Sequence, residues 1–140
     1  MTVLYSAEMA GLVAVPVSLP SGGVVDGNVR VKRSTITLAT QTTSDTIVIA
    51  KATAGESFLY GVLTASATLG ASATIAIGVT GTTGKYRAAA TFTAANTPTL
   101  FGTAAGAATL AADEEIFITI GSASLPGSGT LVVDMYFSAT

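Results

Sequence analysis

The chain has 140 residues, of which 49% are hydrophobic and only 10% are charged, and its formal net charge is −2. This length suits a single domain with a two-layer core, and the slight negative charge gives no electrostatic basis for binding nucleic acid. The chain has no cysteine and no histidine, which excludes disulfides and cysteine-ligated metals and removes the usual general base.

The low charge also bears on the surface of the domain. An ordinary soluble domain carries about 25% charged residues, so we expect part of this surface to contact protein rather than water. A surface rich in threonine, serine and glycine would also stay hydrated, and that alternative remains open. The basic cluster at residues 29–33, VRVKR, is too small to indicate a phosphate-binding track.

Residues 57–84 and 88–112 contain no charged side chain. Their apolar residues occur in short groups separated by polar residues and glycine, whereas a membrane-spanning helix needs about 20 mainly apolar residues in a row. The N-terminal stretch contains Glu8 and no sustained apolar core, so it does not resemble a secretory signal. We therefore expect no membrane partner.

Residues 1–26 are expected to form an extended N-terminal arm, and residues 27–140 a β-sandwich domain. Pro16 and Pro20 prevent a long helix and favour extended or turn conformations. Proline also fits poorly inside a regular sheet, so the arm is expected either to lie over its own domain or to reach onto a neighbouring subunit. The residues assigned to these contacts are mostly apolar: Val3, Leu4, Tyr5, Leu12, Val13, Val15, Pro16, Val17 and Leu19.

Residues 28–39 are expected to form one long strand or two shorter ones. Val29 and Val31 have one parity and Ile36 has the other, so strict alternation would place them on opposite faces of a sheet. A β-bulge near Arg33–Ser34 would bring them onto one buried face.

The rest of the chain reads as short strands separated by turn residues. The alanine-rich piece 104–112 is expected to be a loop, because Gly106 interrupts it and no amphipathic stripe is present. Further strands are expected over residues 45–50, 58–64, 74–79, 85–93, 99–101, 116–120 and 130–138, with Gly81–Gly84 as a hairpin turn. About eight strands and no convincing helix predict an all-β fold, an antiparallel β-sandwich. A jelly roll is favoured over an immunoglobulin-like form, whose core Cys and Trp are absent.

Three groups of residues were tested for chemistry. The segment GVTGTTGKY, residues 78–86, has the wrong glycine spacing for a phosphate-binding loop and lacks the Ser or Thr that should follow Lys85. The run Asp113-Glu114-Glu115 does not have the alternate spacing of a calcium loop, and a solvated strand entry explains it better.

A glycosidase pair among Asp45, Glu56 and Asp134 would need folding to bring two carboxylates about 5–10 Å apart. Sugar sites also favour tryptophan, which the chain lacks. The eight phenylalanine and tyrosine residues after the arm fall on expected strand positions, where core and subunit contacts explain them more simply. No catalytic residue, metal site or cofactor is therefore assigned.

The segment GVLTASATLGASATIAIGVTGTTGKYRAAATF, preceded by GESF and followed by TPTLFG and SLPGSGTLVVDMYFSAT, resembles small virion structural proteins of tailed bacteriophages. It is similar to capsid decoration proteins, also called head-stabilising or cement proteins, and to related head-fibre bases. The resemblance runs from about Asp26 to Thr140, and the N-terminal YSAEMAGLVAVP is also similar to arms of this group. It carries no catalytic signature.

The resemblance implies a β-sandwich or jelly-roll subunit, usually a homotrimer, at local three-fold axes on the outside of an icosahedral capsid. The implied partners are the major capsid protein and further copies of the chain, and the implied location is the capsid surface of a virion assembled in the host cytoplasm. A tail, neck or head-fibre protein is the main alternative. A carbohydrate-binding β-sandwich module is a more distant one, and an enzyme is the least favoured.

Overall fold

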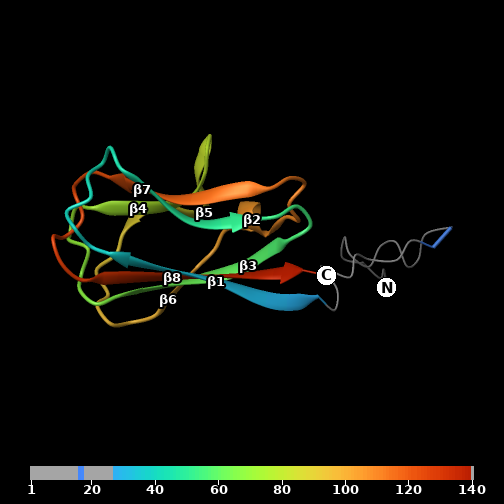
Figure 1. Ribbon diagram of the computed structural model, residues 1–140, viewed down its shortest axis with the longest axis horizontal. Coiled ribbons are helices and arrows are strands. Elements are labelled where there is room, and N and C mark those ends of the chain that lie inside the picture. Colours follow the sequence, from blue (N-terminus) through green and yellow to red (C-terminus); the bar gives the residue numbers. More distant parts are fainter. Residues whose placement is uncertain (1–15, 18–26, 140) are drawn as a thin grey trace, which may run out of the picture.

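The structure is a computed structural model that describes residues 16–17 and 27–139, and its strands form two four-stranded antiparallel sheets packed face to face (Figure 1). Sheet A has the order β1-β8-β3-β6 and sheet B the order β2-β7-β4-β5. The strands are β1 (Asn28–Thr37), β2 (Thr46–Ala52), β3 (Ser57–Ala65), β4 (Thr74–Val79), β5 (Thr82–Thr91), β6 (Thr99–Phe101), β7 (Glu114–Gly121) and β8 (Thr130–Ala139). The predicted β-sandwich is confirmed.

The strand pairing is nested along the chain. β1 pairs with β8, β2 with β7, β3 with β6 and β4 with β5, so strands near the start of the domain meet strands near its end. The same ribbon of paired strands folds across both sheets, which is the connectivity of an eight-stranded jelly roll. The fold therefore agrees with the preferred form of the predicted sandwich.

The core lies between the two sheets and follows from alternation along each strand. On β8, Leu131, Val133, Met135 and Phe137 all point inward and are at most 1% exposed. On β7, three isoleucines at alternate positions face them from the other layer. A period of two therefore places one apolar row of each strand in the core and leaves the other row facing outward.

An aromatic cluster joins the two sheets at one end of this core. The ring of Phe58 on β3 lies 4.8 Å from that of Tyr86 on β5, 5.6 Å from that of Phe137 on β8 and 6.2 Å from that of Phe101 on β6. Gly61 leaves room for Phe101, because a Cβ at Gly61 would lie 2.1 Å from the Phe101 ring. Such aromatic pairs stabilise the fold through the apolar area that they bury and through their favourable ring geometry.

The predicted bulge in the first strand is wrong. β1 pairs with β8 in an unbroken register from Asn28 to Thr37, so Val29 and Val31 face away from the core while Ile36 is buried. Register against β8 determines the parity of β1, and the two valines therefore stay on the outer face of sheet A.

Two smaller expectations also change. The β4–β5 turn is formed by Thr80 and Gly81, and β5 already begins at Thr82; Gly81 has a φ of +82°, the positive φ that a type II turn requires at its second central residue. Within the predicted loop 104–112, residues Ala104–Ala107 form a short 3-10 helix, η2, whose N-cap is Thr103. Gly106 there packs against Tyr86, where a Cβ would lie 2.9 Å from the ring.

Candidate interaction surfaces

The outer face of sheet A carries a row of apolar and aromatic side chains across three strands. Val31 on β1 lies opposite Tyr136 on β8, which lies opposite Tyr60 on β3. The rings of Tyr60 and Tyr136 stack with centroids 4.6 Å apart and an interplanar angle of 16°. Val31 is 54% exposed and Tyr60 is 41% exposed, so this row forms an exposed platform of apolar and aromatic side chains.

The next row across sheet A contains its outward-facing charges. Arg33 on β1 donates two hydrogen bonds to the carboxylate of Asp134 on β8, at 2.6 and 2.8 Å. The hydrogen bond to Asp134 and the charge of its carboxylate raise the pKa of Arg33. The row continues to Val62 on β3 and Leu100 on β6, which is 70% exposed. The two charges therefore neutralise each other within an otherwise uncharged surface.

The outer face of sheet B is partly covered by its own chain. A Cβ at Gly78 on β4 would lie 2.2 Å from the carbonyl oxygen of Thr82 and 2.4 Å from that of Thr83, so the start of β5 passes directly over this face. Part of β5 rises from sheet B on the side away from sheet A (Figure 1). Ala76 lies on the same outward side of β4 as Gly78 and is only 4% exposed.

Further along β5, Arg87 ties this strand to β4. Its guanidinium donates to the backbone carbonyls of Ile75 on β4 and of Ala90 and Thr91 on β5. Burial lowers the pKa of Arg87. The register of β4 against β5 shifts on both sides of the Ile77–Arg87 pair, and these shifts let β5 leave the plane of the sheet.

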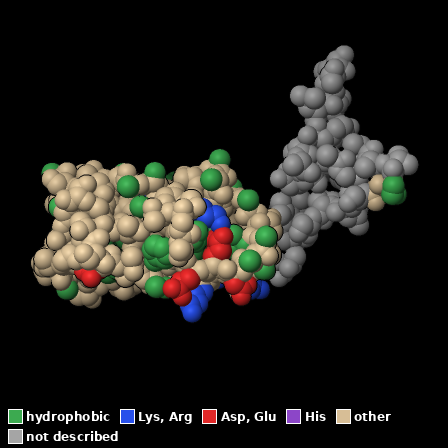
Figure 2. Space-filling model, turned by 90° about the horizontal axis from the view of Figure 1, so that it is seen from above, with side chains coloured by type: hydrophobic (Ala, Val, Ile, Leu, Met, Phe, Trp, Pro, Cys, Tyr) green, Lys and Arg blue, Asp and Glu red, His purple; other side chains and the backbone are tan. Residues whose placement is uncertain are grey.

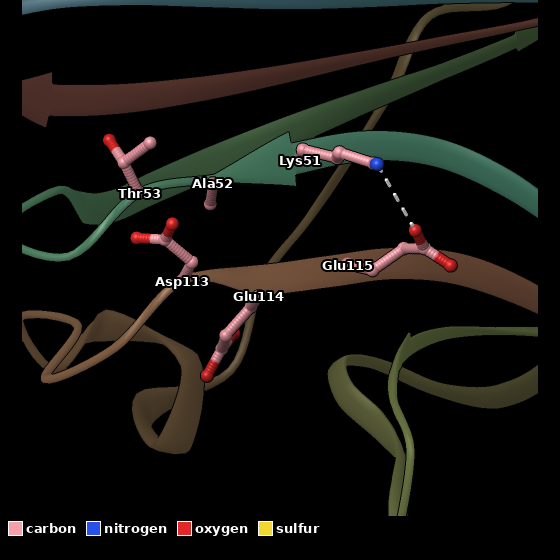
Figure 3. A pocket seen from close by; sticks show the side chains of 6 residues that line it. All are labelled: Lys51, Ala52, Thr53, Asp113, Glu114 and Glu115. Atoms are coloured by element: carbon pink, nitrogen blue, oxygen red, sulfur yellow. Dashed lines mark ion pairs between the residues drawn. The ribbon is translucent and has the colours of Figure 1, made fainter.

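The space-filling view from the sheet B side shows mostly polar side chains and backbone, with the charged side chains gathered over one region (Figure 2). That region includes a shallow depression of about 370 Å³, lined by residues 51–53 and 113–115. Its three neighbouring carboxylates point in different directions (Figure 3). Glu115 faces Lys51 at 3.6 Å, and Asp113 accepts a hydrogen bond from the backbone N–H of Ala54 at 2.9 Å.

The third carboxylate of this run supports the aromatic cluster. Glu114 forms an ion pair with Lys85 and accepts a hydrogen bond from the Tyr86 hydroxyl at 2.7 Å. Burial raises the pKa of Tyr86, and the hydrogen bond to Glu114 raises it further. Lys85, the lysine of the GVTGTTGKY segment, is therefore engaged in a structural ion pair. All three carboxylates of the run have structural partners.

The three carboxylates considered for a glycosidase pair each have a different partner in the structure. Asp134 binds Arg33 on the outer face of sheet A. Glu56 is buried, with its carboxylate 3.2 Å from the Lys32 ammonium and accepting a hydrogen bond from the Thr53 backbone. Asp45 accepts hydrogen bonds from Thr42 in an exposed turn. Each of the three carboxylates therefore has a structural role of its own.

Among the described residues, no group of three or more acidic side chains is arranged to hold a metal ion. Within the same residues, no helix is long and apolar enough to cross a membrane.

Of the residues predicted to make arm contacts, Pro16 and Val17 are described, and both are exposed, Val17 by 63%. Val3, Leu4, Tyr5, Leu12, Val13, Val15 and Leu19 lie outside the described residues.

The outer face of sheet A is the surface that the sequence did not single out. The sequence pattern predicts core or subunit contacts in general for Tyr60 and Tyr136, and a buried face for Val29 and Val31. Strict alternation from Asn28 to Thr37 separates these valines from Ile36, but alternation alone does not determine which of the two faces is buried.

No protein-family model matches the chain, and no curated protein matches it. Solved structures of phage capsids contain chains of the same fold. A chain of the cyanophage Pam1 capsid asymmetric unit matches with a TM-score of 0.68 at 19% sequence identity, over 81% of this chain and 86% of that chain.

Two further capsid structures give similar matches. A chain of the capsid of Ralstonia phage GP4 has a TM-score of 0.62 at 15% identity, over 81% of this chain and 86% of that chain. A chain of the acidic stable capsid structure of Helicobacter pylori bacteriophage KHP30 has a TM-score of 0.60 at 8% identity, over 79% of this chain and 86% of that chain. At these identities the likeness shows a shared fold.

Proposed function

We propose that this protein is a structural component of a bacteriophage virion, and that it is a decoration subunit bound to the outside of an icosahedral head. The observation that carries the proposal is the fold likeness to chains of three phage capsid structures, each over about four fifths of this chain. The carboxylates of the described domain are engaged in structural contacts, which fits a protein that works by binding.

The mechanism is stabilisation by mass action. A subunit that binds the mature capsid lattice, and does not bind the loosened lattice, shifts the equilibrium toward the mature form. Many identical weak contacts around a shell add up to strong attachment. The partners would be the major capsid protein and other copies of this chain, arranged as a homotrimer, with residues 1–26 as an arm that contacts neighbouring subunits.

The experiment is a binding titration on empty, expanded heads that lack this protein. Purified chain is added, the heads are sedimented, and the bound copies per head are counted by densitometry. Saturation on the order of hundreds of copies, as expected for many equivalent lattice sites, together with increased heat resistance of the heads, supports decoration. Saturation at a few to tens of copies would instead indicate a tail, neck or head-fibre position, and no binding would contradict a capsid role.

In the described part of the chain, the Tyr60–Tyr136 stack is the feature that suits the carbohydrate-binding alternative, since aromatic faces can stack against sugars. The platform lies on the outer face of sheet A, and the hydrogen-bonding groups beside it, Arg33 and Asp134, bind each other. A glycan array that shows binding abolished by Tyr60→Ala would support that alternative, whereas an array without binding would contradict it.

A further inference from the structure

Within residues 27–139, large apolar side chains on the outer face of sheet A remain exposed. Its outward rows expose Val29, Val31, Tyr60 and Leu100. These are four of the seven large exposed hydrophobic residues in the described part of the chain, and of the others only Val48 lies on the outer face of sheet B. An apolar surface concentrated on one face marks an interaction site.

The charges on this face indicate an uncharged partner. Among the outward positions of β1, β8, β3 and β6, only Arg33 and Asp134 are charged, and they bind each other through two hydrogen bonds. A charged side chain of a partner would therefore find no unpaired opposite charge among these outward positions. Packing two such faces together would desolvate two ion pairs, which costs free energy, whereas an uncharged segment would cover only one.

This chain itself contains an uncharged and mostly apolar segment. Residues 9–25, MAGLVAVPVSLPSGGVV, carry no charge and lie between Glu8 and Asp26. The segment leads into β1, an edge strand of sheet A, at the end where Val29 and Val31 are exposed.

The reach of the segment allows it to contact a neighbouring molecule. Residues 20–27 separate Leu19 from Asn28, and an extended chain of this length spans roughly 30 Å. A four-stranded sheet is only about 15 Å wide. In the single chain, Pro16 and Val17 are exposed, so sheet A of the same chain does not cover these two residues.

We propose that the outer face of sheet A is the docking surface for residues 9–25 of a second copy of this chain. The apolar residues of the segment would cover the row from Val31 to Tyr60 and the side chain of Leu100. Pro16 and Pro20 suit an extended segment that lies across strands without joining their hydrogen-bond ladder. This inference rests on the part of the proposed function that assigns residues 1–26 to contacts between subunits.

Disulfide cross-linking of the full-length chain tests the proposal directly, because the chain has no cysteine of its own. A tagged chain carrying Val17→Cys is mixed with an untagged chain carrying Val31→Cys or Leu100→Cys, and the mixture is oxidised. The matched control is Val48→Cys, which is 51% exposed on the outer face of sheet B. The expected result is a tagged–untagged product severalfold more abundant with either sheet A variant than with the control.

Three outcomes would overturn the proposal. One is an equal yield with Val48→Cys, or no cross-copy product. Another is a dilution-independent cross-link within single chains that carry both Val17→Cys and Val31→Cys, which would show that the segment covers its own sheet. The third is preferential Val31→Cys self-cross-linking, which would show that two sheet A faces pack together.

Substitution with charge gives an independent readout. Val31→Asp or Leu100→Asp is expected to weaken self-association by about tenfold or more, because one buried aliphatic side chain contributes that much to a contact. Val48→Asp should leave it unchanged. Light scattering over a concentration series measures the association, and thermal unfolding verifies that each variant is folded. Equal association of all variants would contradict the proposal.

The cross-link and the head titration can fail separately. If the cross-copy product forms while the protein does not bind heads, the decoration function is wrong and the docking surface stands. If heads are decorated at high copy number while Val17→Cys does not react with sheet A, the docking surface is wrong and decoration stands.

Discussion

The two sheets share one core, but their outer faces differ in what covers them. On sheet B, the start of β5 folds back over Gly78, and Arg87 ties β5 to β4 through backbone carbonyls. On sheet A, valine, leucine and tyrosine side chains remain exposed around one ion pair between Arg33 and Asp134.

The difference shows where an assembly contact is useful. A face that the chain covers itself gains little from a partner, because its apolar residues are already removed from water. A face that stays apolar and open gains the transfer free energy of each side chain that a partner covers. In this domain that face is the outer face of sheet A.

The largest expected effect compares the inner and the outer side of strand β8. Phe137 and Tyr136 are neighbours on β8, but Phe137 is fully buried in the aromatic cluster and Tyr136 stacks on Tyr60 outside. Phe137→Ala should cost about 3–5 kcal/mol of unfolding free energy through the cavity that it leaves. Tyr136→Ala should cost no more than about 1.5 kcal/mol, since it loses mainly one ring contact. Urea unfolding measures both, and equal losses would show that the outer face belongs to the folding core.

The next test opens the cover over sheet B. Gly78→Ala places a Cβ against two backbone carbonyls that cannot rotate away, so it should cost about 1–3 kcal/mol through overpacking. Gly102→Ala is the matched control, because its Cβ would meet its nearest neighbour, the Phe58 ring, at an ordinary 3.6 Å. Similar melting temperatures for the two variants would mean that β5 does not lie tightly over Gly78.

A smaller effect concerns the hydrogen bond that supports the aromatic cluster from sheet B. Tyr86→Phe removes the donor to Glu114 and leaves its packing area unchanged. The expected cost at neutral pH is about 1–2 kcal/mol, because the lost hydrogen bond has a charged acceptor. Thermal unfolding at neutral pH measures it, and an unchanged melting temperature would contradict the bond.

The same residue makes stability depend on alkaline pH. Burial and Glu114 raise the pKa of Tyr86 in the folded state above its ordinary value of about 10. The protonated hydroxyl therefore makes its full contribution to the unfolding free energy below about pH 10, and this contribution is lost as the pH rises further. Above about pH 10, the melting temperature should fall more steeply with pH in the wild type than in Tyr86→Phe. Parallel curves would show that folding does not raise the pKa of Tyr86.

The smallest effect compares the two outer faces directly. Val31→Ser on sheet A and Val48→Ser on sheet B replace valines of similar exposure. Each should change the unfolding free energy of the isolated chain by no more than about 0.5 kcal/mol, as for other surface substitutions. Only Val31→Ser should reduce self-association. If Val48→Ser reduces association as much, the contrast between the faces does not extend to assembly.

The sequence predicted most of the strands, because alternating apolar residues between turn residues indicate each strand locally. The eight strands of the structure lie within a few residues of the expected ranges. It predicted the candidate surface poorly. Val29 and Val31 are as apolar as Ile36, and nothing local says which of them faces water.

The amino-acid sequence by itself determined the sandwich, since a period of two and frequent turn residues suffice for antiparallel strands with one buried face. Only the tertiary structure decided which face stays open. The register of β1 against β8 turns Val31 outward beside Tyr136, and the fold of β5 over Gly78 closes the opposite sheet. Both depend on contacts between strands that lie far apart along the chain, where local pattern carries no information about pairing.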